Sequence, residues 1–312
     1  MKIFSIIVTY NGMKWIDWCL HSLRVSTIPI TPIIIDNGST DTTLEFISSH
    51  YPDAVILPMN SNLGFGQANN KGFEYALTHD ATHVLLLNQD AALQPNTIQT
   101  LLAHDNGIQL LSPIHLNGKG TKIDRNFKVN TLIKGAINNS LLDDIYAARR
   151  SKNIYPVTYV NAACWLMPIE VVKKIGGFNP LFYHYSEDDN YLNRLQYHHI
   201  PVLVVTNAFI YHDREIHGSE KMYQKNKVFR RLLVCRTNIN FNFAERIKQR
   251  YRIAFHTLGE AVSSHNIWLF INDWIWANCK LILIDKKIRY SRKQEKKIQS
   301  NWLPYNNSSL KI

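Results

Sequence analysis

The stretch Ile3-Phe4-Ser5-Ile6-Ile7-Val8-Thr9-Tyr10-Asn11-Gly12 decides the fold class of this 312-residue chain. Its apolar and β-branched residues run from 3 to 9 and stop at a polar turn. A short, nearly continuous apolar run is typical of a strand that is buried on both faces of a parallel sheet. The run lacks the longer apolar region and the small-residue cleavage site of a signal peptide. It therefore predicts a first buried strand.

The same pattern is repeated over the next hundred residues. Further strands are expected at 32–36, 54–58 and 83–88, and helices at 13–24, 42–50, 66–78 and from Pro95 to about His104. Thr42 and Glu45 have the spacing of a capping box. Strands that alternate with helices predict βαβ units and a parallel sheet. Ligands bind outside the carboxyl ends of such strands, so the polar loops 10–12, 36–39 and 88–90 indicate one site.

The middle of the chain is less regular. Residues 115–156 are rich in Asn, Gly and Lys with weak periodicity, which predicts a long, functional loop. Apolar character returns at 157–168, and a helix then runs to Ile175 and ends at Gly176-Gly177. An acidic cluster opens a helix that ends at Tyr197, and strands at 202–205 and 208–211 lead to His212. The pattern becomes helical and basic from about 220, so we predict two domains, 1–215 and 216–312.

The charge is concentrated in the last third of the chain. Residues 1–210 hold 15 Lys and Arg against 16 Asp and Glu, whereas residues 211–312 hold 20 against 8. This asymmetry predicts an anionic partner for the last third, such as a membrane surface, a nucleic acid or an acidic polymer. With 46% hydrophobic residues, the chain is neither disordered nor collagen-like nor a coiled coil. Its four widely spaced cysteines suggest reduced thiols in a cytosolic protein.

The basic third also contains an apolar segment. Residues 267–284 include 14 apolar residues of 18, but Asn272, Asp273, Asn278 and Lys280 interrupt the run, so no membrane-spanning helix is predicted. Tryptophans 268, 274 and 276 lie between two blocks rich in Lys and Arg. This arrangement fits a helix that lies in a membrane interface. A packed helical extension with solvated lysines fits it as well.

Three loops carry residues of chemical interest. Asn88-Gln89-Asp90 follows a strand and offers oxygen ligands that suit Mg²⁺ or Mn²⁺, although it could also be a helix cap. Gly64-Phe65-Gly66 begins like a dinucleotide fingerprint, but Asn69 stands at its third glycine, so a Rossmann dinucleotide site is excluded. The segment 64–71 is then either a Gly-rich turn at a ligand or an ordinary turn. Asp36 begins either a binding loop or a simple turn.

The acidic cluster Glu187-Asp188-Asp189 is a candidate general base. Three adjacent carboxylates repel one another, which raises the pKa of at least one of them and makes it a better proton acceptor. A cap at the helix N-terminus is the alternative. His212 follows an apolar strand and is either structural or a metal ligand.

Together these segments resemble family 2 of the glycosyltransferases, which are inverting enzymes with a GT-A fold. The resemblance covers about residues 1–215 and is closest to the bacterial rhamnosyltransferase-like branch. It is carried by six segments in order, Ile6–Gly12, Ile33–Asp41, Asn62–Gly72, Leu85–Asp90, Gly176–Asn179 and Glu187–Arg194. It implies a Rossmann-like mixed α/β sheet with helices on both faces, followed here by a basic helical C-terminal extension.

The resemblance also implies roles for individual residues. Nucleotide-sugar binding would involve Thr9, Tyr10, Asn11, Asp36, Gly64, Asn69, Lys71 and Gln89. Asp90 would be the principal ligand of Mg²⁺ or Mn²⁺, with Asn88 and His212 as further ligands. Asp188 would deprotonate the acceptor. Trp165 would either present an aromatic face to an acceptor sugar or pack in the core. Asn88 replaces the family's first metal-binding Asp, and Asn190 replaces a further Asp of the acidic motif, which leaves Glu187 and Asp189 as alternative bases.

The implied function is transfer of a sugar from a UDP or dTDP donor to a hydroxyl of a glycan or lipid-linked acceptor in bacterial surface polysaccharide synthesis. We expect a cytoplasmic enzyme, held peripherally at the inner face of an anionic membrane by its C-terminal region. A sugar nucleotidyltransferase would share pyrimidine and metal binding but would release pyrophosphate. A nucleic-acid-binding protein could use the basic third, but no recognition motif supports it, and no nucleic acid is expected.

Overall fold

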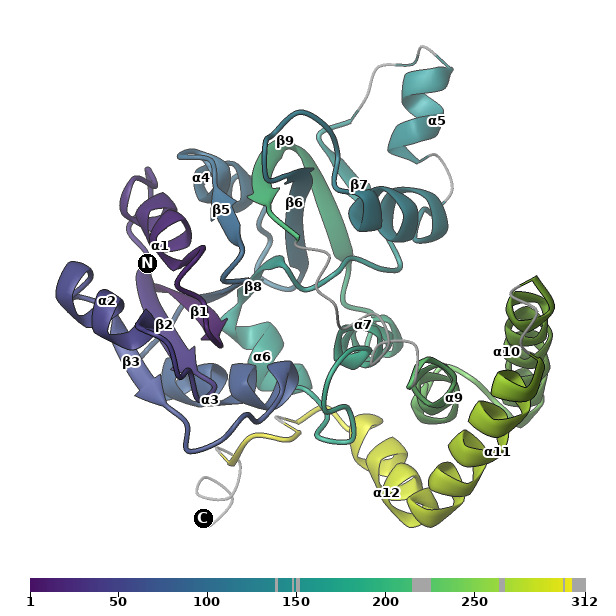
Figure 1. Cartoon of the computed structure of the whole chain (residues 1–312). Helices are drawn as coiled ribbons and strands as arrows, with labels where there is room; N and C mark the ends of the chain where they lie inside the picture. The colour runs from purple at the N-terminus through teal and green to yellow at the C-terminus, as the bar shows by residue number, and fades with distance from the viewer. Residues whose placement is uncertain are drawn as a thin grey trace.

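The computed structural model describes residues 1–137, 140–147, 149, 152–214, 226–263, 267–299 and 301–304. A nine-stranded mixed sheet has helices on both faces, and a helical arm projects from it (Figure 1). The main strand order is β3-β2-β1-β4-β8-β6-β9-β5, and β7 pairs with β9. The strands are β1 (Ile3–Thr9), β2 (Thr31–Asp36), β3 (Val55–Pro58), β4 (His83–Leu87), β5 (Ala91–Leu93), β6 (Leu110–Asn117), β7 (Ile154–Pro156), β8 (Cys164–Pro168) and β9 (Val202–His212).

The first half of the fold agrees with the predicted βαβ pattern. Strands β1 to β4 are parallel, and they alternate with α1 (Ile16–Arg24), α2 (Thr43–His50) and α3 (Phe65–Thr78), followed by α4 (Thr97–Leu102). Successive residues of β1 point to opposite faces, so Ile6 packs in the core beneath α3 whereas Ile7 packs in the core beneath α1. Burial on both faces explains why the strand sequences are apolar without alternation.

The predicted capping box at Thr42 is wrong. The Thr42 side chain makes no capping hydrogen bond. The Asp41 carboxylate instead accepts hydrogen bonds from the backbone N–H of Thr43 at 3.1 Å and of Met13 at 3.4 Å. This carboxylate therefore joins the start of α2 to the loop after β1.

The predicted long loop at 115–156 is also wrong as a description of the structure. Strand β6 extends to Asn117, and the segment then forms the π-helix η1 (Phe127–Lys134), the helix α5 (Leu141–Tyr146) and strand β7. The Asp124 carboxylate accepts a hydrogen bond from the Phe127 N–H at 2.8 Å and fixes the start of η1. Weak periodicity hid these elements because a π-helix and a three-residue strand have no clear repeat.

The second half contains α6 (Ile169–Ile175), which ends at Gly176 as predicted, and α7 (Glu187–Tyr197). The two strands expected at 202–205 and 208–211 form one strand, β9, that pairs with β6. Its register shifts between two neighbouring pairs, from Pro113 opposite Val205 to Ile114 opposite Phe209. The polar break in the sequence is thus an irregularity within one strand.

The C-terminal arm contains α9 (Lys227–Thr237), α10 (Phe243–Ser263), α11 (Ile267–Leu283) and α12 (Asp285–Glu295). The predicted domain boundary at 215 lies outside the described residues. After α12 the chain returns to the body, where the Asn301 carbonyl accepts a hydrogen bond from the Gly177 N–H at 2.8 Å. Leu303 belongs to the core beneath α3 and α7. The end of the arm is therefore part of the main core.

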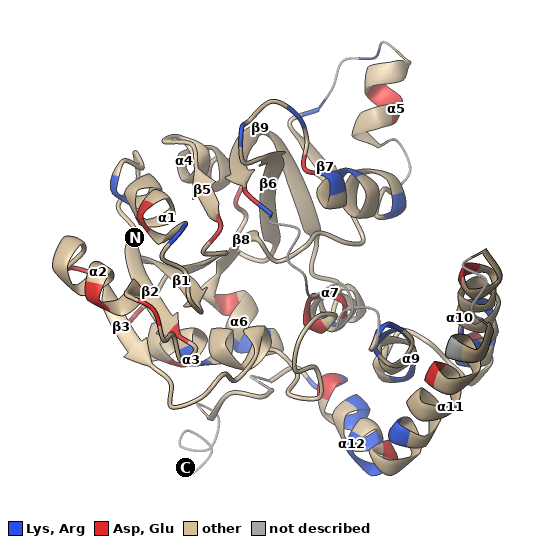
Figure 2. Cartoon of the chain, in the orientation of Figure 1, with Lys and Arg blue, Asp and Glu red and all other residues tan. Residues whose placement is uncertain are grey.

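Helices α10 and α11 carry large apolar side chains that face away from the core. Phe255 is 71% exposed, Trp268 is 76% exposed and Leu283 is 84% exposed. All five acidic side chains of α10, α11 and α12 are buried or half-buried, whereas eight Lys and Arg side chains are exposed. Figure 2 shows the basic residues along α12. We call the exposed apolar and basic side chains of these three helices the arm surface. Within the described ranges, no helix has the length and apolarity needed to cross a membrane.

Candidate active site

The carboxyl ends of β1 and β4 are joined by Gln89. Its Oε1 accepts hydrogen bonds from the Thr9 hydroxyl at 2.7 Å and from the Tyr10 N–H at 3.1 Å. A Cβ atom at Gly12 would lie 2.4 Å from the same oxygen, so a side chain there would displace the Gln89 amide. Gln89 therefore fixes the loop after β1, and the Tyr10 ring beside it is 48% exposed.

The loop after β2 folds onto the loop after β1. Both carboxylate oxygens of Asp36 accept backbone hydrogen bonds, from the N–H groups of Gly38 and Ser39. The Asn11 side-chain oxygen accepts one from the Thr40 N–H at 2.8 Å. Asp36 thus has the turn-forming role that the sequence left open. The structure brings Thr9, Tyr10, Asn11, Asp36 and Gln89 together at one edge of the sheet.

The predicted site residues of α3 are less close to this edge. Gly64 caps the helix, and a Cβ atom there would lie 1.9 Å from the Tyr183 carbonyl oxygen. Asn69 is buried and donates to the Phe65 carbonyl at 2.9 Å, so it stabilises the first turns of the helix. Lys71 pairs with Glu74 at 2.9 Å and lines a separate hollow that contains none of the other predicted site residues. Predicted contacts of Asn69 and Lys71 with the donor find no support in this arrangement.

Asp90 and His212 come together because of the sheet register. Ala91 of β5 lies opposite His212 of β9, which places Asp90 beside the imidazole, and Asp90 Oδ1 is 3.2 Å from His212 Nε2. Burial opposes ionisation of Asp90, but the hydrogen bond and charge of His212 and the charge of Arg214 outweigh it and lower the pKa of this carboxyl.

The donor set at this point suits a divalent cation. The Asn88 side-chain oxygen is buried without a hydrogen-bond partner, and so is the His212 Nδ1. A carboxylate, an imidazole and an amide oxygen are acceptable ligands for Mg²⁺ or Mn²⁺. Among the described residues, no group of three or more His, Cys, Asp or Glu side chains has a metal-binding arrangement. Any cation here would therefore need further ligands, such as diphosphate oxygens.

The acidic motif lies at the first turn of α7. Burial raises the pKa of both Glu187 and Asp189, and the neighbouring Asp188 charge raises it further. Burial also raises the pKa of Asp188, although hydrogen bonds oppose this shift. The sequence predicted a raised pKa in this cluster, and that direction is confirmed. Burial is the larger cause of the rise, and repulsion between the carboxylates is the smaller one. All three carboxyls are better proton acceptors than exposed ones.

Asp188 has a partner that sequence reasoning missed. The Tyr159 hydroxyl donates a hydrogen bond to Asp188 Oδ2 at 2.7 Å, and the Asp189 N–H donates to Oδ1 at 2.9 Å. Burial and the charges of Asp188 and Asp189 hold the pKa of Tyr159 well above its usual range, so the phenol keeps its proton. Tyr159 lies outside any motif, 29 residues before its partner, so the sequence carries no signal for this contact.

Arg214 is a second residue that the sequence analysis missed. Its Nε is 3.2 Å from Asp124 Oδ2 at the start of η1. Its positive charge also lowers the pKa of both Asp90 and Asp188, so it lies near both carboxylates. The available signal was its position two residues after the proposed ligand His212. Arg214 connects the candidate metal site to the candidate base electrostatically.

The backbone before the acidic motif is strained. Tyr185 and Ser186 both have left-handed backbone conformations, with φ values of 66° and 70°. Two successive non-glycine residues in this region are unusual, and such strain is concentrated at functional sites. Two residues before Tyr185, the Tyr183 hydroxyl donates a hydrogen bond to the Asn62 carbonyl at 3.1 Å. The loop 180–186 is thereby held against the loop before α3.

The acceptor-binding prediction for Trp165 is wrong. The side chain is fully buried in the main core and stacks against Phe178, with ring centroids 6.2 Å apart. Its other aromatic neighbour is Tyr191, at 5.7 Å. Neither face of the indole is open to a sugar, and the core-packing alternative holds.

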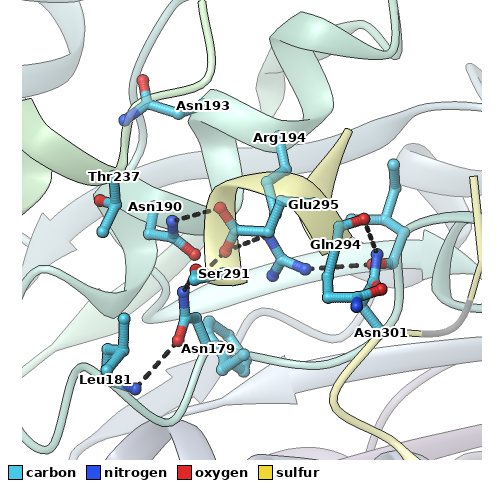
Figure 3. A network of polar contacts seen from close by, with 12 residues as sticks. Asn179, Leu181, Asn190, Asn193, Arg194, Thr237, Ser291, Gln294, Glu295 and Asn301 are labelled. Carbon is cyan, nitrogen blue, oxygen red and sulfur yellow. Dashed lines mark hydrogen bonds and ion pairs between the residues drawn. The ribbon is translucent and has the colours of Figure 1, made fainter. Parts of the chain in front are cut away.

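A buried polar network joins α7 to the arm (Figure 3). Glu295 at the end of α12 is fully buried. Its Oε1 accepts a hydrogen bond from Asn179 Nδ2 at 2.7 Å and lies 3.9 Å from Arg194 Nε, and its Oε2 accepts one from Asn190 Nδ2 at 3.4 Å. Asn190 therefore has a structural role. The helix that begins with the acidic motif is held in place by the C-terminal arm.

A family model described as glycosyl transferase family 2 matches residues 5–175. The match spans more than half of the chain. The chain belongs to glycosyl transferase family 2. It is a glycosyltransferase, as the six ordered segments predicted.

Two curated relatives are rhamnosyltransferases. The N-acetylglucosaminyl-diphospho-decaprenol L-rhamnosyltransferase of Mycobacterium tuberculosis is 26% identical over 212 residues, which are 61% of this chain and 69% of the relative. The O-antigen chain rhamnosyltransferase WbaN of Salmonella anatum is 32% identical over 107 residues, a third of each chain. The glycosyltransferase is thus similar to enzymes of the branch that the sequence suggested.

Solved structures confirm the GT-A fold. TarS of S. aureus, in complex with UDP-GlcNAc, has a TM-score of 0.63 at 16% identity and covers 95% of this chain and 88% of its own. A mannosyltransferase of Pyrobaculum calidifontis, in complex with GDP-Man and Mn²⁺, matches with a TM-score of 0.56 at 12% identity. The match covers 94% of this chain and 84% of the mannosyltransferase. The predicted mixed sheet with a helical C-terminal extension is confirmed.

Proposed function

We propose that this glycosyltransferase moves a sugar from a UDP or dTDP donor to a hydroxyl of a glycan or lipid-linked acceptor, with inversion, in the synthesis of a bacterial surface polysaccharide. The names of both relatives support this acceptor class, since one concerns a diphospho-decaprenol and the other an O-antigen chain. The complex of TarS with UDP-GlcNAc supports a uridine nucleotide donor.

The contact between Tyr159 and Asp188 carries the proposal. An inverting transfer requires a base that takes the acceptor proton while the hydroxyl oxygen attacks the anomeric carbon. Asp188 accepts this proton, a new carbon–oxygen bond forms, and the bond to the donor diphosphate breaks on the opposite face. Tyr159 holds the Asp188 carboxylate in one orientation. The charge of Asp188 raises the pKa of Glu187 and of Asp189, so these two neighbours hold their protons while Asp188 is ionised.

The diphosphate leaves with negative charge that the protein must stabilise. Asp90 and His212, with the Asn88 amide oxygen, would hold Mg²⁺ or Mn²⁺, which supplies positive charge beside the diphosphate. Arg214 adds a permanent positive charge near Asp90 and Asp188, whereas Lys71, which was expected at the donor, pairs with Glu74. The exposed Tyr10 ring at the edge of the sheet is suited to receive the nucleotide base, and Asp36 shapes the loop beside it.

A donor panel tests the proposed reaction. Full-length protein is incubated with UDP-, dTDP- and GDP-sugars in the presence of Mn²⁺ or Mg²⁺, and the released products are identified. We expect nucleoside diphosphate from one UDP- or dTDP-sugar. Pyrophosphate release would instead indicate a nucleotidyltransferase. Full turnover by an Asp90→Ala variant would show that Asp90 is not a required metal ligand.

Replacement of the base gives a sharper test. An Asp188→Asn variant is expected to lose about 10²- to 10⁴-fold in kcat, since general base catalysis contributes that much. Asp53→Asn changes an exposed carboxylate far from the motif in sequence and serves as the matched control. An Asp188→Asn enzyme with unchanged kcat would move the base role to Glu187 or Asp189.

The arm surface supports a peripheral position on an anionic membrane. Exposed aromatic and aliphatic side chains of α10 and α11 lie on the same arm as exposed lysines and arginines, and the acids of these helices are buried or half-buried. Apolar contact together with attraction to anionic lipid is how interfacial helices bind. We infer that the arm holds the enzyme at the cytoplasmic membrane face, where lipid-linked acceptors are found.

A further inference from the structure

A cavity of about 350 Å³ lies between the loop before the acidic motif and the C-terminal arm. Its walls come from the loop 180–185 and from helices α9, α11 and α12. The volume is sufficient for a small ligand group. This cavity is not formed by any of the residues assigned above to the donor, the metal or the base.

The chemistry of the cavity favours a strong anion. Arg230, Lys280 and Lys287 line it, and none of its described lining residues is acidic. Arg230 is only 9% exposed, and its guanidinium lies 5.3 Å from the centre of the Tyr185 ring. The Lys280 ammonium lies 4.8 Å from the Phe229 ring centre. Aromatic rings thus hold two cations at the wall, the nearly buried Arg230 and the exposed Lys280, and such cations make charge-assisted hydrogen bonds to phosphate groups.

The cavity adjoins the candidate base. The strained residue Tyr185 lines the cavity, and the acidic motif begins two residues later, at Glu187. The charge of Arg230 lowers the pKa of Glu187, so the cationic wall lies near the acidic motif. A ligand group in the cavity would therefore lie near the start of α7, the helix that carries the candidate base.

One wall of the cavity continues into an apolar surface. Ile284 lines the cavity, and the preceding residues Ile282 and Leu283 are 69% and 84% exposed. These residues belong to the arm surface that we place on the membrane. A ligand with a charged group and a long apolar chain could occupy the cavity and leave its chain along this path.

We propose that this cavity binds the diphosphate of a lipid-linked acceptor, with the lipid chain leaving past Ile282 and Leu283 and the acceptor sugar directed toward Asp188. This assignment rests on the proposed transferase function and specifies how the acceptor is held. Lys280 and Lys287 make contact with the acceptor diphosphate and Arg230 adds positive charge from the wall, while Asp90, His212 and Arg214 serve the separate diphosphate of the donor.

Calorimetric titration of the full-length protein with farnesyl diphosphate and, separately, with UDP tests the proposal. Farnesyl diphosphate is expected to bind, and Lys280→Gln and Lys287→Gln are each expected to weaken it by about tenfold, the typical effect of losing one charge-assisted hydrogen bond. Lys293→Gln removes an exposed lysine of α12 outside the cavity and should leave the Kd unchanged. The Kd for UDP should be unchanged in all three variants.

Four results would overturn the proposal. Competition between farnesyl diphosphate and UDP would place both in the donor site. Binding of farnesol as tight as that of its diphosphate would leave no role for the cations. Displacement of farnesyl diphosphate by dihexanoyl phosphatidylglycerol at equal concentration would indicate a general lipid headgroup site. The fourth result is a Lys293→Gln variant that weakens binding as much as the cavity variants do. Failure of the transferase proposal would appear differently, as no nucleoside diphosphate release with intact farnesyl diphosphate binding.

Discussion

At the scale of single residues, the candidate site depends on contacts between distant positions. Gln89 accepts hydrogen bonds from residues 80 and 79 positions away. The sequence indicated which loops meet, because strand ends of a parallel sheet share one edge. It did not indicate that Tyr159 donates to Asp188 or that Lys71 turns to Glu74, because such contacts are decided by side-chain geometry after folding.

The hydrogen bond from Tyr159 should set the pH dependence of the reaction. Burial raises the pKa of Asp188, and the Tyr159 hydrogen bond opposes that rise. A Tyr159→Phe variant loses this opposition, so the pKa rises further and the base is protonated at higher pH. We expect the acidic limb of the kcat/KM profile to move to higher pH, measured with the donor identified by the panel.

The exposed Tyr146 provides a matched control, since Tyr146→Phe removes the same hydroxyl from a side chain that is 88% exposed. The acidic limb of the kcat/KM profile of Tyr146→Phe should lie at the same pH as that of the wild-type enzyme. The pKa that this limb reports is a property of the coupled carboxylates as a group. An acidic limb unaltered by Tyr159→Phe would show that this hydrogen bond does not tune the base.

At the scale of elements, α7 is held by its neighbours more than by its own sequence. Its N-cap residue Ser186 makes no capping hydrogen bond. Contacts with α12 instead fix it through Asn190 and Arg194. Local patterns predicted β1 to β4 and the intervening helices well. They failed for η1 and β7, and for the docking of α12, because these depend on long-range packing.

The Glu295 network makes a prediction about stability. Glu295→Ala leaves Arg194, Asn179 and Asn190 without their buried acceptor, so the free energy of unfolding should fall by about 3 kcal/mol or more. Denaturation by urea, followed by circular dichroism, measures this loss. Glu170→Ala, which breaks an exposed pair with Lys173, should cost less than about 1 kcal/mol. Equal losses in both variants would contradict the structural role of Glu295.

The pH dependence of a Glu295→Gln variant gives a second measurement. Burial raises the folded-state pKa of Glu295, although Arg194 and the hydrogen bonds lower it. Wild-type protein therefore gains stability from the protonated form at low pH and loses it as pH rises through the folded pKa. Glutamine does not titrate, so the difference in unfolding free energy should move in favour of the variant as pH rises. A difference independent of pH would argue against the raised pKa.

At the scale of the whole molecule, the neutral catalytic body and the basic arm have different surfaces. The charge asymmetry of the sequence was enough to predict that the last third has a separate task. The sequence could not show that α10 and α11 expose apolar side chains together, since the same residues would fit a packed helical extension. Only the three-dimensional arrangement shows which side chains remain outside the core.

Vesicle binding tests the task of the arm. Full-length protein should cosediment with vesicles of phosphatidylglycerol and phosphatidylcholine, bind vesicles of phosphatidylcholine alone more weakly, and dissociate as salt screens the charges. Trp268→Ala should weaken binding roughly tenfold, from about 1.5 kcal/mol or more for one inserted apolar side chain. Tyr146→Ala is the control on an exposed aromatic residue outside the arm. Binding that is equal for neutral and anionic vesicles would contradict the proposed electrostatic part.

The return of residues 301–303 to the body has a consequence for the order in which the enzyme matures on the ribosome. Leu303 completes the core beneath α7, and the Asn301 carbonyl secures Gly177. Most of the sheet can form while the arm is still being made. A nascent chain that has not yet released residue 303 lacks these contacts, so we expect the acidic motif to be fully fixed only after the arm has been synthesised.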